Sequence, residues 1–449
     1  MIKDKSFYIT LAKIAVPLAL QNLITFGIGL MDNFMVGSLG DSALSGVFLS
    51  NQIQWMLQML NAGLSAALVV LAAQYLGKKD SRKAKVVINI AIKSAFGVGL
   101  AFMMLALLIP RQILGLFTSE QVVIDEGIKY IGIVCFSYVF FCLNSVFLAS
   151  MRCAQNTRIG FISSVVGFCV NVFLNWVLIF GNLGLPALGV RGAAIATVFA
   201  RACEFSVSFS YVRFRDTALR WRIRELVLHN ADIRRDFFKY GFPVILGDIC
   251  WGIAGVAQVA ILGRLGTEVL AANTIAANLH QMLGVVVYGI ANASGVIIGR
   301  TVGAGDYDKL KPYANTLQVI FLCFGIITSA LIFTAKDLIL AVGFQNISAE
   351  ARAYAIQFLS VFSVTIIGTS YQMSVLTGIV RAGGATHFVL INDLFHVWLL
   401  VIPSAMLSAF VFHFPPVVTF ACLKCDQLIK CIVAVIKLNR YDWMKKLTR

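Results

Sequence analysis

Asp32, in the stretch "GLMDNFMVG", is the ionisable residue whose position most needs a chemical explanation. It lies well inside an apolar segment that begins near Ile9. A charged aspartate at the centre of a membrane helix costs roughly 2.5–3.5 kcal/mol on insertion scales. No Lys or Arg lies within one helical turn of Asp32, so an ion pair within its own helix is excluded. The carboxylate must therefore meet a partner on another helix, bind a cation or take up a proton.

Polar residues in two later apolar segments are candidate partners for this carboxylate. Asn171 and Asn175 are spaced i, i+4 in "VNVFLNWVLIFG" and so share one helix face, and Thr197 follows in "GAAIATV". Carboxylate, amide and hydroxyl oxygens together suit a hard monovalent cation such as Na⁺. A desolvated carboxylate would instead hold a proton more tightly. We predict a coupling site for Na⁺ or H⁺ at Asp32, Asn171, Asn175 and Thr197; the simpler alternative is a neutral Asp32 packed against the two amides.

The second half of the chain contains its own intramembrane acids. Asp248 lies in "GFPVILGDICWG" and Asp393 in "LINDLFHVW", whereas the position that matches Asp32 is Gln258. These three residues are candidates for a substrate or proton site in the second half. The alternative for Asp393 is a structural role, paired with a neighbouring polar helix.

Two further groups of charges fit local ion pairs. Asp426 and Lys430 are spaced i, i+4, and Arg201 and Glu204 i, i+3, which are the spacings of neighbours on a helix surface. We interpret both pairs as structural.

The elements that carry these residues are apolar helices long enough to span a bilayer. The chain has 449 residues, of which 59% are hydrophobic and only 13% charged, and its mean hydropathy is +0.85. A soluble domain has about a quarter charged residues, so the chain is predicted to be an all-α membrane protein. The twelve predicted spans are 9–37, 45–76, 86–110, 128–151, 159–181, 192–212, 238–263, 270–299, 314–335, 352–379, 387–409 and 414–437.

The net charge of +16 reflects loops on one side of the membrane and does not indicate nucleic-acid binding. On the side of the N-terminus lie 27 of the 37 basic residues, from Lys3 to Arg449, and only six lie on the other side. The positive-inside rule then places both termini and the basic loop 213–239 in the cytoplasm. The expected location is the plasma membrane, with the lipid bilayer as the main partner.

The chain repeats itself with an offset of 226 residues. "VPLALQNLITFGIGLMDNFMVGSLGDSAL" aligns with "FPVILGDICWGIAGVAQVAILGRLGTEVL", which matches Pro17 with Pro243 and Gly29 with Gly255. We therefore predict two lobes, 1–225 with spans one to six and 226–449 with spans seven to twelve, joined by loop 213–239. Six spans in each lobe give both the same orientation, an arrangement of parallel repeats that favours alternating-access transport.

Several motifs of other function classes are absent from the sequence. It has no Gly-x-x-x-x-Gly-Lys phosphate loop and no His-Glu-x-x-His zinc motif, so neither ATP hydrolysis nor a cofactor is expected. A membrane-embedded hydrolase is the enzyme alternative, but no nucleophile and base have the required spacing.

These motifs together resemble those of the multidrug and toxic compound extrusion (MATE) transporters of bacteria, both NorM-like and DinF-like. The similar stretches are "MDNFMVGSLG", "AAQYLGKKDSRKAK", "MRCAQNTR", "NWVLIFGNLGLPALGVRGAAIATV" and, in the second half, "GAGDYDKLK" and "VRAGGAT". The resemblance covers essentially the whole chain, and "GVRGAAIAT" after "IFGNLG" is its most specific part.

This resemblance implies a V-shaped pair of six-helix lobes that exports amphipathic, mostly cationic compounds in exchange for Na⁺ or H⁺. The first-span acid of the family falls on Asp32, and its amino-terminal cation site on Asp32, Asn171, Asn175 and Thr197. DinF-like branches have Asp where Asn175 stands here, and NorM-like acids of the seventh and tenth spans are replaced by Trp251 and Ser370. A monomer is expected. The alternative within the same superfamily is a lipid-linked precursor flippase, for which the first two spans of each half lack a row of basic residues.

Overall fold

The computed structural model describes residues 2, 4–118, 120–343 and 348–448, so Lys3 and Arg449 lie outside the described residues. These residues form helices and connecting loops, and no β-strand occurs among them. The helices of the first half are α1 (Lys5–Gly37), α2 (Asp41–Gly77), α3 (Ser81–Leu108), α4 (Pro110–Gly115), α5 (Gln121–Val134), α6 (Ser137–Cys153), α7 (Arg158–Phe180), η1 (Asn182–Gly184), α8 (Val190–Ser210), η2 (Tyr211–Arg215) and η3 (Ile223–Val227). Those of the second half are α9 (Ala231–Gly263), α10 (Thr267–Ala304), α11 (Tyr307–Gly343), α12 (Ala349–Met373), η4 (Ser374–Val380), α13 (Thr386–Leu394), η5 (Phe395–Val401), α14 (Ile402–Met406), η6 (Leu407–Val411), α15 (Pro416–Lys424) and α16 (Asp426–Asn439).

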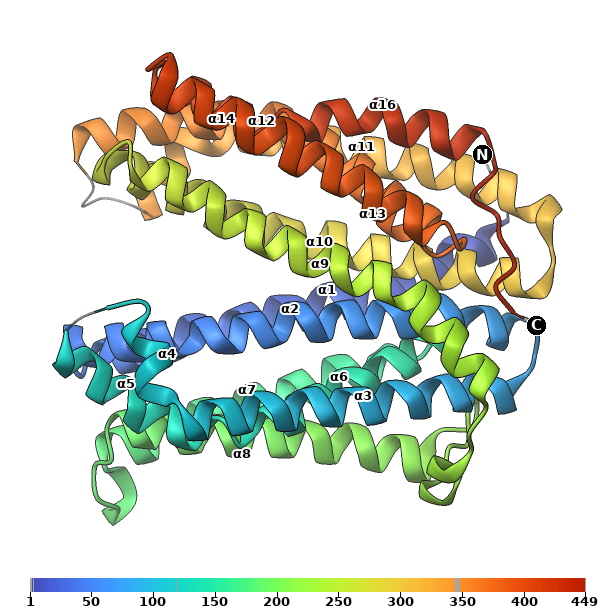
Figure 1. The fold of residues 1–449 in the computed structure, drawn as a ribbon, viewed down its shortest axis with the longest axis horizontal. Helices are drawn as coiled ribbons and strands as arrows, with labels where there is room; N and C mark the ends of the chain where they lie inside the picture. Colours follow the sequence, from blue (N-terminus) through green and yellow to red (C-terminus); the bar gives the residue numbers. More distant parts are fainter. Residues whose placement is uncertain (1, 3, 119, 344–347, 449) are drawn as a thin grey trace. The chain divides into compact units, whose positions relative to one another are not determined.

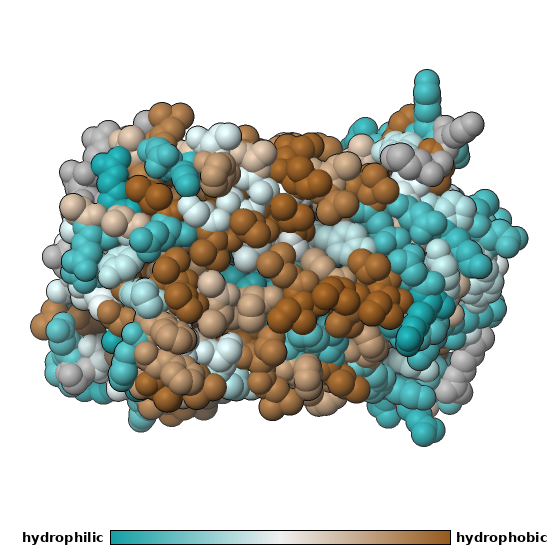
Figure 2. All heavy atoms as spheres, turned by 90° about the horizontal axis from the view of Figure 1, so that it is seen from above, coloured by the Kyte–Doolittle hydropathy of each residue, from teal (hydrophilic) through white to brown (hydrophobic). Residues whose placement is uncertain are grey.

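The prediction of an all-α membrane protein is confirmed. Within the described residues, ten helices are long and apolar enough to cross a membrane, and α5 with α6 forms an eleventh candidate if the bent pair is one span. Apolar side chains predominate in the middle of the face shown in Figure 2, and hydrophilic ones gather toward its two ends. This distribution is the one expected of helices whose central parts contact lipid.

Three predicted segments differ from the structure in form. The predicted span 128–151 is not one straight helix, because α5 and α6 meet at a bend of 51°. The predicted span 414–437 forms α15 and α16, which are separated at Cys425 between the charged residues Lys424 and Asp426. The predicted loop 213–239 is helical from Ala231 onward, because α9 begins before its apolar part.

The helix boundaries repeat with the same offset as the sequence. The first residues of α1 and α9, Lys5 and Ala231, are 226 positions apart, and so are their last residues, Gly37 and Gly263. Each of the two helices contains a proline, Pro17 or Pro243, at the matching position. The two halves are therefore built from corresponding elements.

The chain forms two compact units, which we call the N-terminal and C-terminal units. The N-terminal unit comprises Val16–Ala72 and Asp80–Gly241. The C-terminal unit comprises Met1–Ala15, Ala73–Lys79 and Phe242–Arg449. The repeat defines the predicted lobes, whereas contacts define these units, and each unit is described below by itself.

Packing in the N-terminal unit centres on α8, which contacts α5, α6 and α7 (Figure 1). Gly192 near the start of α8 makes the α7–α8 contact close, because a Cβ there would lie 2.5 Å from the carbonyl oxygen of Leu178. In the C-terminal unit, α12 packs against α10, α11, α15 and α16, and the rings of Phe358 and Phe420 stack with their centroids 4.2 Å apart. These contacts fix the helices that carry the polar residues described next.

Candidate functional site

Asp32 meets its nearest polar partner on α7. Asn175 donates a hydrogen bond from Nδ2 to Asp32 Oδ1 over 2.5 Å. The same Nδ2 donates to Asn171 Oδ1 over 3.2 Å, one turn earlier on α7. The structure thus brings Asp32, Asn171 and Asn175 together, as the i, i+4 spacing of the two asparagines predicts.

Two atoms of this cluster are buried without a partner. Among the described residues, Asn175 Oδ1 and Asn171 Nδ2 have no hydrogen-bond partner. Both asparagine side chains are fully buried, whereas Asp32 is half-buried. A buried amide group without a partner destabilises the fold by about 1–3 kcal/mol. The cluster therefore has an acceptor atom, Asn175 Oδ1, for which the described part of the chain supplies no donor.

Thr197 is buried on α8, and among the described residues no hydrogen bond joins it to Asp32, Asn171 or Asn175. Its hydroxyl donates to the carbonyl oxygen of Ala193 over 3.0 Å, which leaves the oxygen's lone pairs available. Tyr130 of α5 interacts with Thr197 and also with the charge of Asp32. The sequence analysis missed Tyr130, because a tyrosine within an apolar segment carries no distinguishing spacing.

A basic side chain also acts electrostatically on the carboxylate. Arg201 of α8 interacts with the charge of Asp32. Its main partner is Glu204, since Arg201 Nη1 and Glu204 Oε2 are 2.8 Å apart, and its guanidinium lies 5.3 Å from the ring centroid of Phe141. The predicted local pair of Arg201 and Glu204 is therefore present, and it lies beside the cluster.

A short connection joins α7, which carries the two asparagines, to α8, which carries Thr197. Gly181 ends α7 with a φ of +75°, a left-handed conformation that glycine adopts without strain. The chain then returns through η1, and Leu188 N donates to the carbonyl oxygen of Leu178 over 2.8 Å. This short return lets α8 run alongside α7.

Asp248 and Asp393, the candidate acids of the second half, are each paired with a basic residue. Arg381 Nη2 lies 2.8 Å from Asp248 Oδ1 and also donates to the carbonyl oxygen of Val244. Lys430 Nζ lies 3.0 Å from Asp393 Oδ1 and 3.3 Å from Asp426 Oδ2. The predicted Asp426–Lys430 pair is present, and Asp393 joins it from α13.

Gln258, the counterpart of Asp32, faces a cation in the structure. Lys424 Nζ donates to Gln258 Oε1 over 3.5 Å, and it lies 5.7 Å from the ring centroid of Phe420. His280 of α10 interacts with the same ammonium group. The two halves thus differ in charge at corresponding places, with a carboxylate in the first and an ammonium group near the second.

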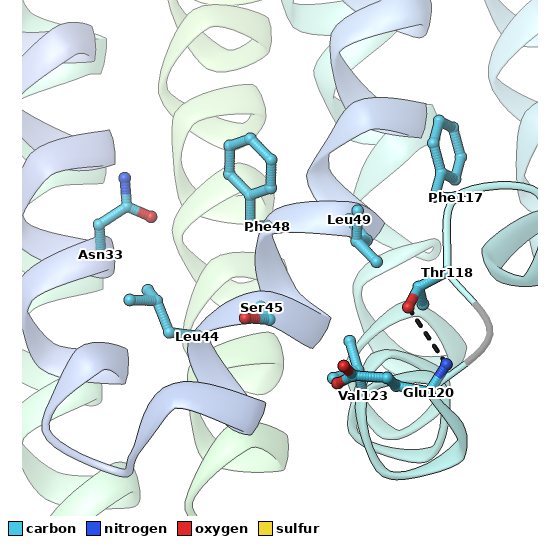
Figure 3. Close-up of a pocket in the computed structure, with 9 residues that line it drawn as sticks. All are labelled: Asn33, Leu44, Ser45, Phe48, Leu49, Phe117, Thr118, Glu120 and Val123. Atoms are coloured by element: carbon cyan, nitrogen blue, oxygen red, sulfur yellow. Dashed lines mark hydrogen bonds between the residues drawn. The ribbon is translucent and has the colours of Figure 1, made fainter. Parts of the chain in front are cut away.

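A cavity of about 590 Å³ opens beside the end of α1 (Figure 3). Asn33, the neighbour of Asp32 in the chain, lines it together with residues of α2 and of the segment that leads into α5. Phe48 and Phe117 expose about half of their surface, and Glu120 is the one charged residue among the lining side chains. The lining residues are Asn33, Leu44, Ser45, Phe48, Leu49, Phe117, Thr118, Glu120 and Val123.

The oxygen atoms around Asp32 could bind one cation in place of the observed hydrogen bonds. Asp32, Asn171, Asn175 and Thr197 together offer carboxylate, amide and hydroxyl oxygens from three helices. In the observed arrangement, the amide N–H of Asn175 occupies the side of the carboxylate that a cation would need. Rotation of the amide would present Asn175 Oδ1, the partnerless acceptor, to that cation. The same carboxylate could instead bind a proton.

A family model described as MatE matches residues 17–177 and 243–407 of this chain. The two matched ranges begin at Pro17 and Pro243, the prolines that the repeat aligns. The family model therefore recognises each half separately.

Several curated proteins are similar over most of their length. A probable multidrug resistance protein NorM from Thermotoga maritima is 27% identical over 326 residues, which are 72% of this chain and 69% of that protein. A multidrug resistance protein NorM from Vibrio vulnificus is 25% identical over 407 residues, which cover 88% of this chain and 86% of that protein. A probable multidrug resistance protein YoeA from Bacillus subtilis is 21% identical over 393 residues, which cover 87% of this chain and 84% of that protein.

Solved structures share the fold. A mutant of the Vibrio cholerae MATE transporter VcmN matches with a TM-score of 0.89 and 17% identity, covering 98% of both chains. A MOP superfamily transporter from Pyrococcus furiosus matches with a TM-score of 0.86 and 18% identity, covering 96% of this chain and 95% of that one.

Proposed function

We propose, from the premise that this chain belongs to the MatE family of multidrug transporters, that it exports amphipathic, mostly cationic compounds in exchange for Na⁺ or H⁺. It is a multi-pass membrane transporter rather than an enzyme. The observation that supports the ion-coupled step is the Asp32 carboxylate, bound by Asn175 and flanked by a buried acceptor that has no partner among the described residues.

Asp32 is the proposed coupling residue, with Asn171, Asn175 and Thr197 as further oxygen donors. Without an ion, Asn175 holds the carboxylate through its amide N–H, as observed. Na⁺ would be bound by Asp32 and by the amide oxygens once the Asn175 amide has turned. A proton on Asp32 would remove its charge and allow its hydroxyl to donate to an amide oxygen. Both changes alter the charge and the hydrogen-bonding groups that Asp32 presents to an organic cation.

The charge distribution favours one coupling site, in the first half. A cation beside Gln258 would be repelled by the Lys424 ammonium group 3.5 Å away. Asp248 and Asp393 would take a proton only after their pairs with Arg381 and Lys430 open. We therefore assign these residues of the second half a subordinate role, in substrate contact or proton binding.

The cavity beside α1 supports the proposal that organic cations follow a route lined by aromatic side chains. Its volume lies within the range of about 300–1,000 Å³ that small-molecule sites occupy. The exposed rings of Phe48 and Phe117 can stack on a flat ligand, and Glu120 can neutralise a positive charge. We propose that both termini and the loop 213–239 face the cytoplasm, that the membrane is the plasma membrane and that the transporter acts as a monomer.

Transport into proteoliposomes with Na⁺ and H⁺ gradients imposed separately tests this proposal. A fluorescent lipophilic cation serves as substrate, and the wild-type chain is compared with the Asp32→Asn variant. One of the two gradients should drive substrate movement in the wild type, and neither should drive it in the variant. The purified variant should still bind the fluorescent cation, which shows that it is folded. Gradient-driven transport by Asp32→Asn at the wild-type rate would exclude Asp32 as the coupling residue.

A further inference from the structure

A second cavity, of about 690 Å³, lies between the first turns of α3 and the segment that contains η3. Both elements belong to the N-terminal unit. The cavity is lined by Arg82 and Lys85 of α3 and by Arg224, Glu225 and Val227 of η3, with Ser81, Leu228 and His229 at its edges. Three basic side chains and one carboxylate thus face the same space. None of them belongs to the proposed coupling site.

The segment that carries Arg224 is anchored firmly to α3. Trp221 is buried, and its indole N–H donates to Asn89 Oδ1 over 2.8 Å. Asn89 Nδ2 donates in turn to the carbonyl oxygen of Glu225 over 2.6 Å. Lys85 Nζ lies 2.7 Å from Glu225 Oε1 and also donates to the carbonyl oxygen of Arg220. The cavity is therefore held open by a hydrogen-bonded frame.

The frame uses Lys85 and Glu225 but leaves two guanidinium groups available. Neither the Arg82 nor the Arg224 guanidinium group has a hydrogen-bond or ion-pair partner among the residues that the structure describes. Both side chains are exposed. Asp80, the nearest further carboxylate in the sequence, caps α3 by accepting from Lys83 N and is paired with the Lys83 ammonium group. The cavity therefore keeps an excess of positive charge.

Apolar side chains next to these arginines are also exposed. Val227 at the end of η3 is 83% exposed, and Ile223 at its start is 51% exposed. Exposed apolar residues beside basic ones are typical of segments that lie at a membrane surface, with the apolar groups among acyl chains and the basic groups at phosphates.

We propose that this cavity binds the phosphate headgroup of an anionic phospholipid, through Arg82 and Arg224, with Ile223 and Val227 against its acyl chains. Guanidinium groups bind phosphate oxygens in bidentate fashion, and the inner leaflet is where anionic lipids concentrate. The leaflet assignment rests on the proposed orientation of the chain. The site itself does not, because it is defined by residues of one unit.

Lipid binding to the full-length chain tests the proposal. The purified protein in phosphatidylcholine nanodiscs is titrated with phosphatidylglycerol, and bound lipid is counted by native mass spectrometry. The double variant R82Q/R224Q should bind phosphatidylglycerol roughly thirtyfold more weakly, since each basic residue at an anionic surface changes binding by about fivefold. Lys85 is kept, because it holds η3 in place. Equal binding by this variant and the wild type would overturn the proposal.

The matched control removes the same charge from the same loop outside the cavity. R213Q/R215Q should weaken binding by less than about threefold, because neither residue lines the cavity and charges without direct contact are screened over a Debye length of about 8 Å. If both variants weaken binding equally, the attraction is general and the cavity is not a site. Nanodiscs expose both leaflets, so a wrong orientation of the chain would leave the result unchanged.

Inorganic phosphate distinguishes a lipid from a soluble anion. Phosphate should displace phosphatidylglycerol poorly from the wild type, because it lacks acyl chains. Val227→Ser should weaken lipid binding while leaving phosphate binding as it is. Phosphate binding as tight as lipid binding, unaffected by Val227→Ser, would replace the lipid with a soluble phosphate and contradict the proposal.

Discussion

At the scale of single residues, Asp32 is explained by its partners on another helix. The carboxylate has no basic neighbour in its own turn, yet the structure supplies an amide N–H at 2.5 Å and, beyond it, the charge of Arg201. One hydrogen bond to a charged group contributes about 1.5–3 kcal/mol, which offsets much of the cost of placing the acid in the membrane. Asn175 Oδ1, which has no partner within the described residues, is the part of the cluster that this structural role leaves unexplained.

Replacing Asn175 by alanine should weaken the coupling ion's binding. Asn175→Ala removes both the N–H that holds Asp32 and the oxygen proposed to face the ion. We expect the ion concentration for half-maximal transport to rise at least about tenfold, which corresponds to the loss of one interaction with a charged group.

Asn144 supplies the matched control for this prediction. It is buried in the same unit, where its Oδ1 accepts from Ser208 over 2.6 Å. Asn144→Ala should lower the thermal unfolding temperature of the purified protein while leaving the half-maximal ion concentration as in the wild type. Equal effects of the two variants on the ion concentration would mean that Asn175 only stabilises the fold.

At the scale of elements, the α7–α8 pair positions the site through one close contact. Gly192→Ala would place a Cβ against the backbone of Leu178 and Ile179, so α8 must move away from α7. We expect a stability loss of about 1–3 kcal/mol, as for other overpacked contacts. Because Thr197 moves with α8, the half-maximal ion concentration should rise as well.

Gly97→Ala in α3 controls for the helix propensity of alanine. A Cβ at Gly97 would have nothing within 4 Å, so the variant should be as stable as the wild type or more stable by up to about 1 kcal/mol. Thermal unfolding in detergent measures both variants. A Gly192→Ala protein as stable as Gly97→Ala, with unchanged ion dependence, would show that the close contact does not position Thr197.

The positions of the membrane-spanning helices could be predicted because each of them forms a separate apolar run in the sequence. The pairing of Asn171 with Asn175 was also predictable, since an i, i+4 spacing fixes a shared face. The bend between α5 and α6 was not, because "GIVCFSY" contains no proline or glycine pair where the helix turns. The periodicity of apolar residues does not report this bend.

Ion pairs between residues that are distant in the sequence could not be predicted either. The Asp426–Lys430 pair could be predicted from its local spacing, whereas the contacts of Lys430 with Asp393 and of Arg381 with Asp248 join residues 37 and 133 positions apart. Such pairs depend on how helices pack, which a single sequence does not reveal. Tyr130 was missed for the same reason, since only the packing of α5 on α8 brings it to Thr197.

At the scale of the whole molecule, the two halves repeat in structure but not in charge. Helix boundaries recur at an offset of 226 residues, yet Asp32 corresponds to Gln258, which faces Lys424. A repeat that keeps its backbone while changing one charge indicates that the backbone does not require the acid. We therefore propose that the acid at this position serves function and that coupling is confined to the first half.

A carboxylate introduced into the second half should not create a second coupling site. In Gln258→Glu the new carboxylate would pair with Lys424, because the oxygen it replaces already lies 3.5 Å from the ammonium group. The number of ions exchanged per substrate, measured from the ion gradient that balances a fixed substrate gradient, should equal that of the wild type. An increase by one ion would contradict the assignment of coupling to the first half.

The most direct test of the central claim is the affinity for substrate as a function of ion concentration. If Asp32 binds the ion and thereby disfavours the substrate, linkage requires each to weaken the binding of the other by the same factor. Equilibrium binding of a fluorescent lipophilic cation to purified protein is measured while Na⁺ and pH are varied separately. The wild-type Kd should rise with one of the two ions, and the Kd of Asp32→Asn should not change with either. An unchanged wild-type Kd, or an equal rise in the variant, would contradict the account.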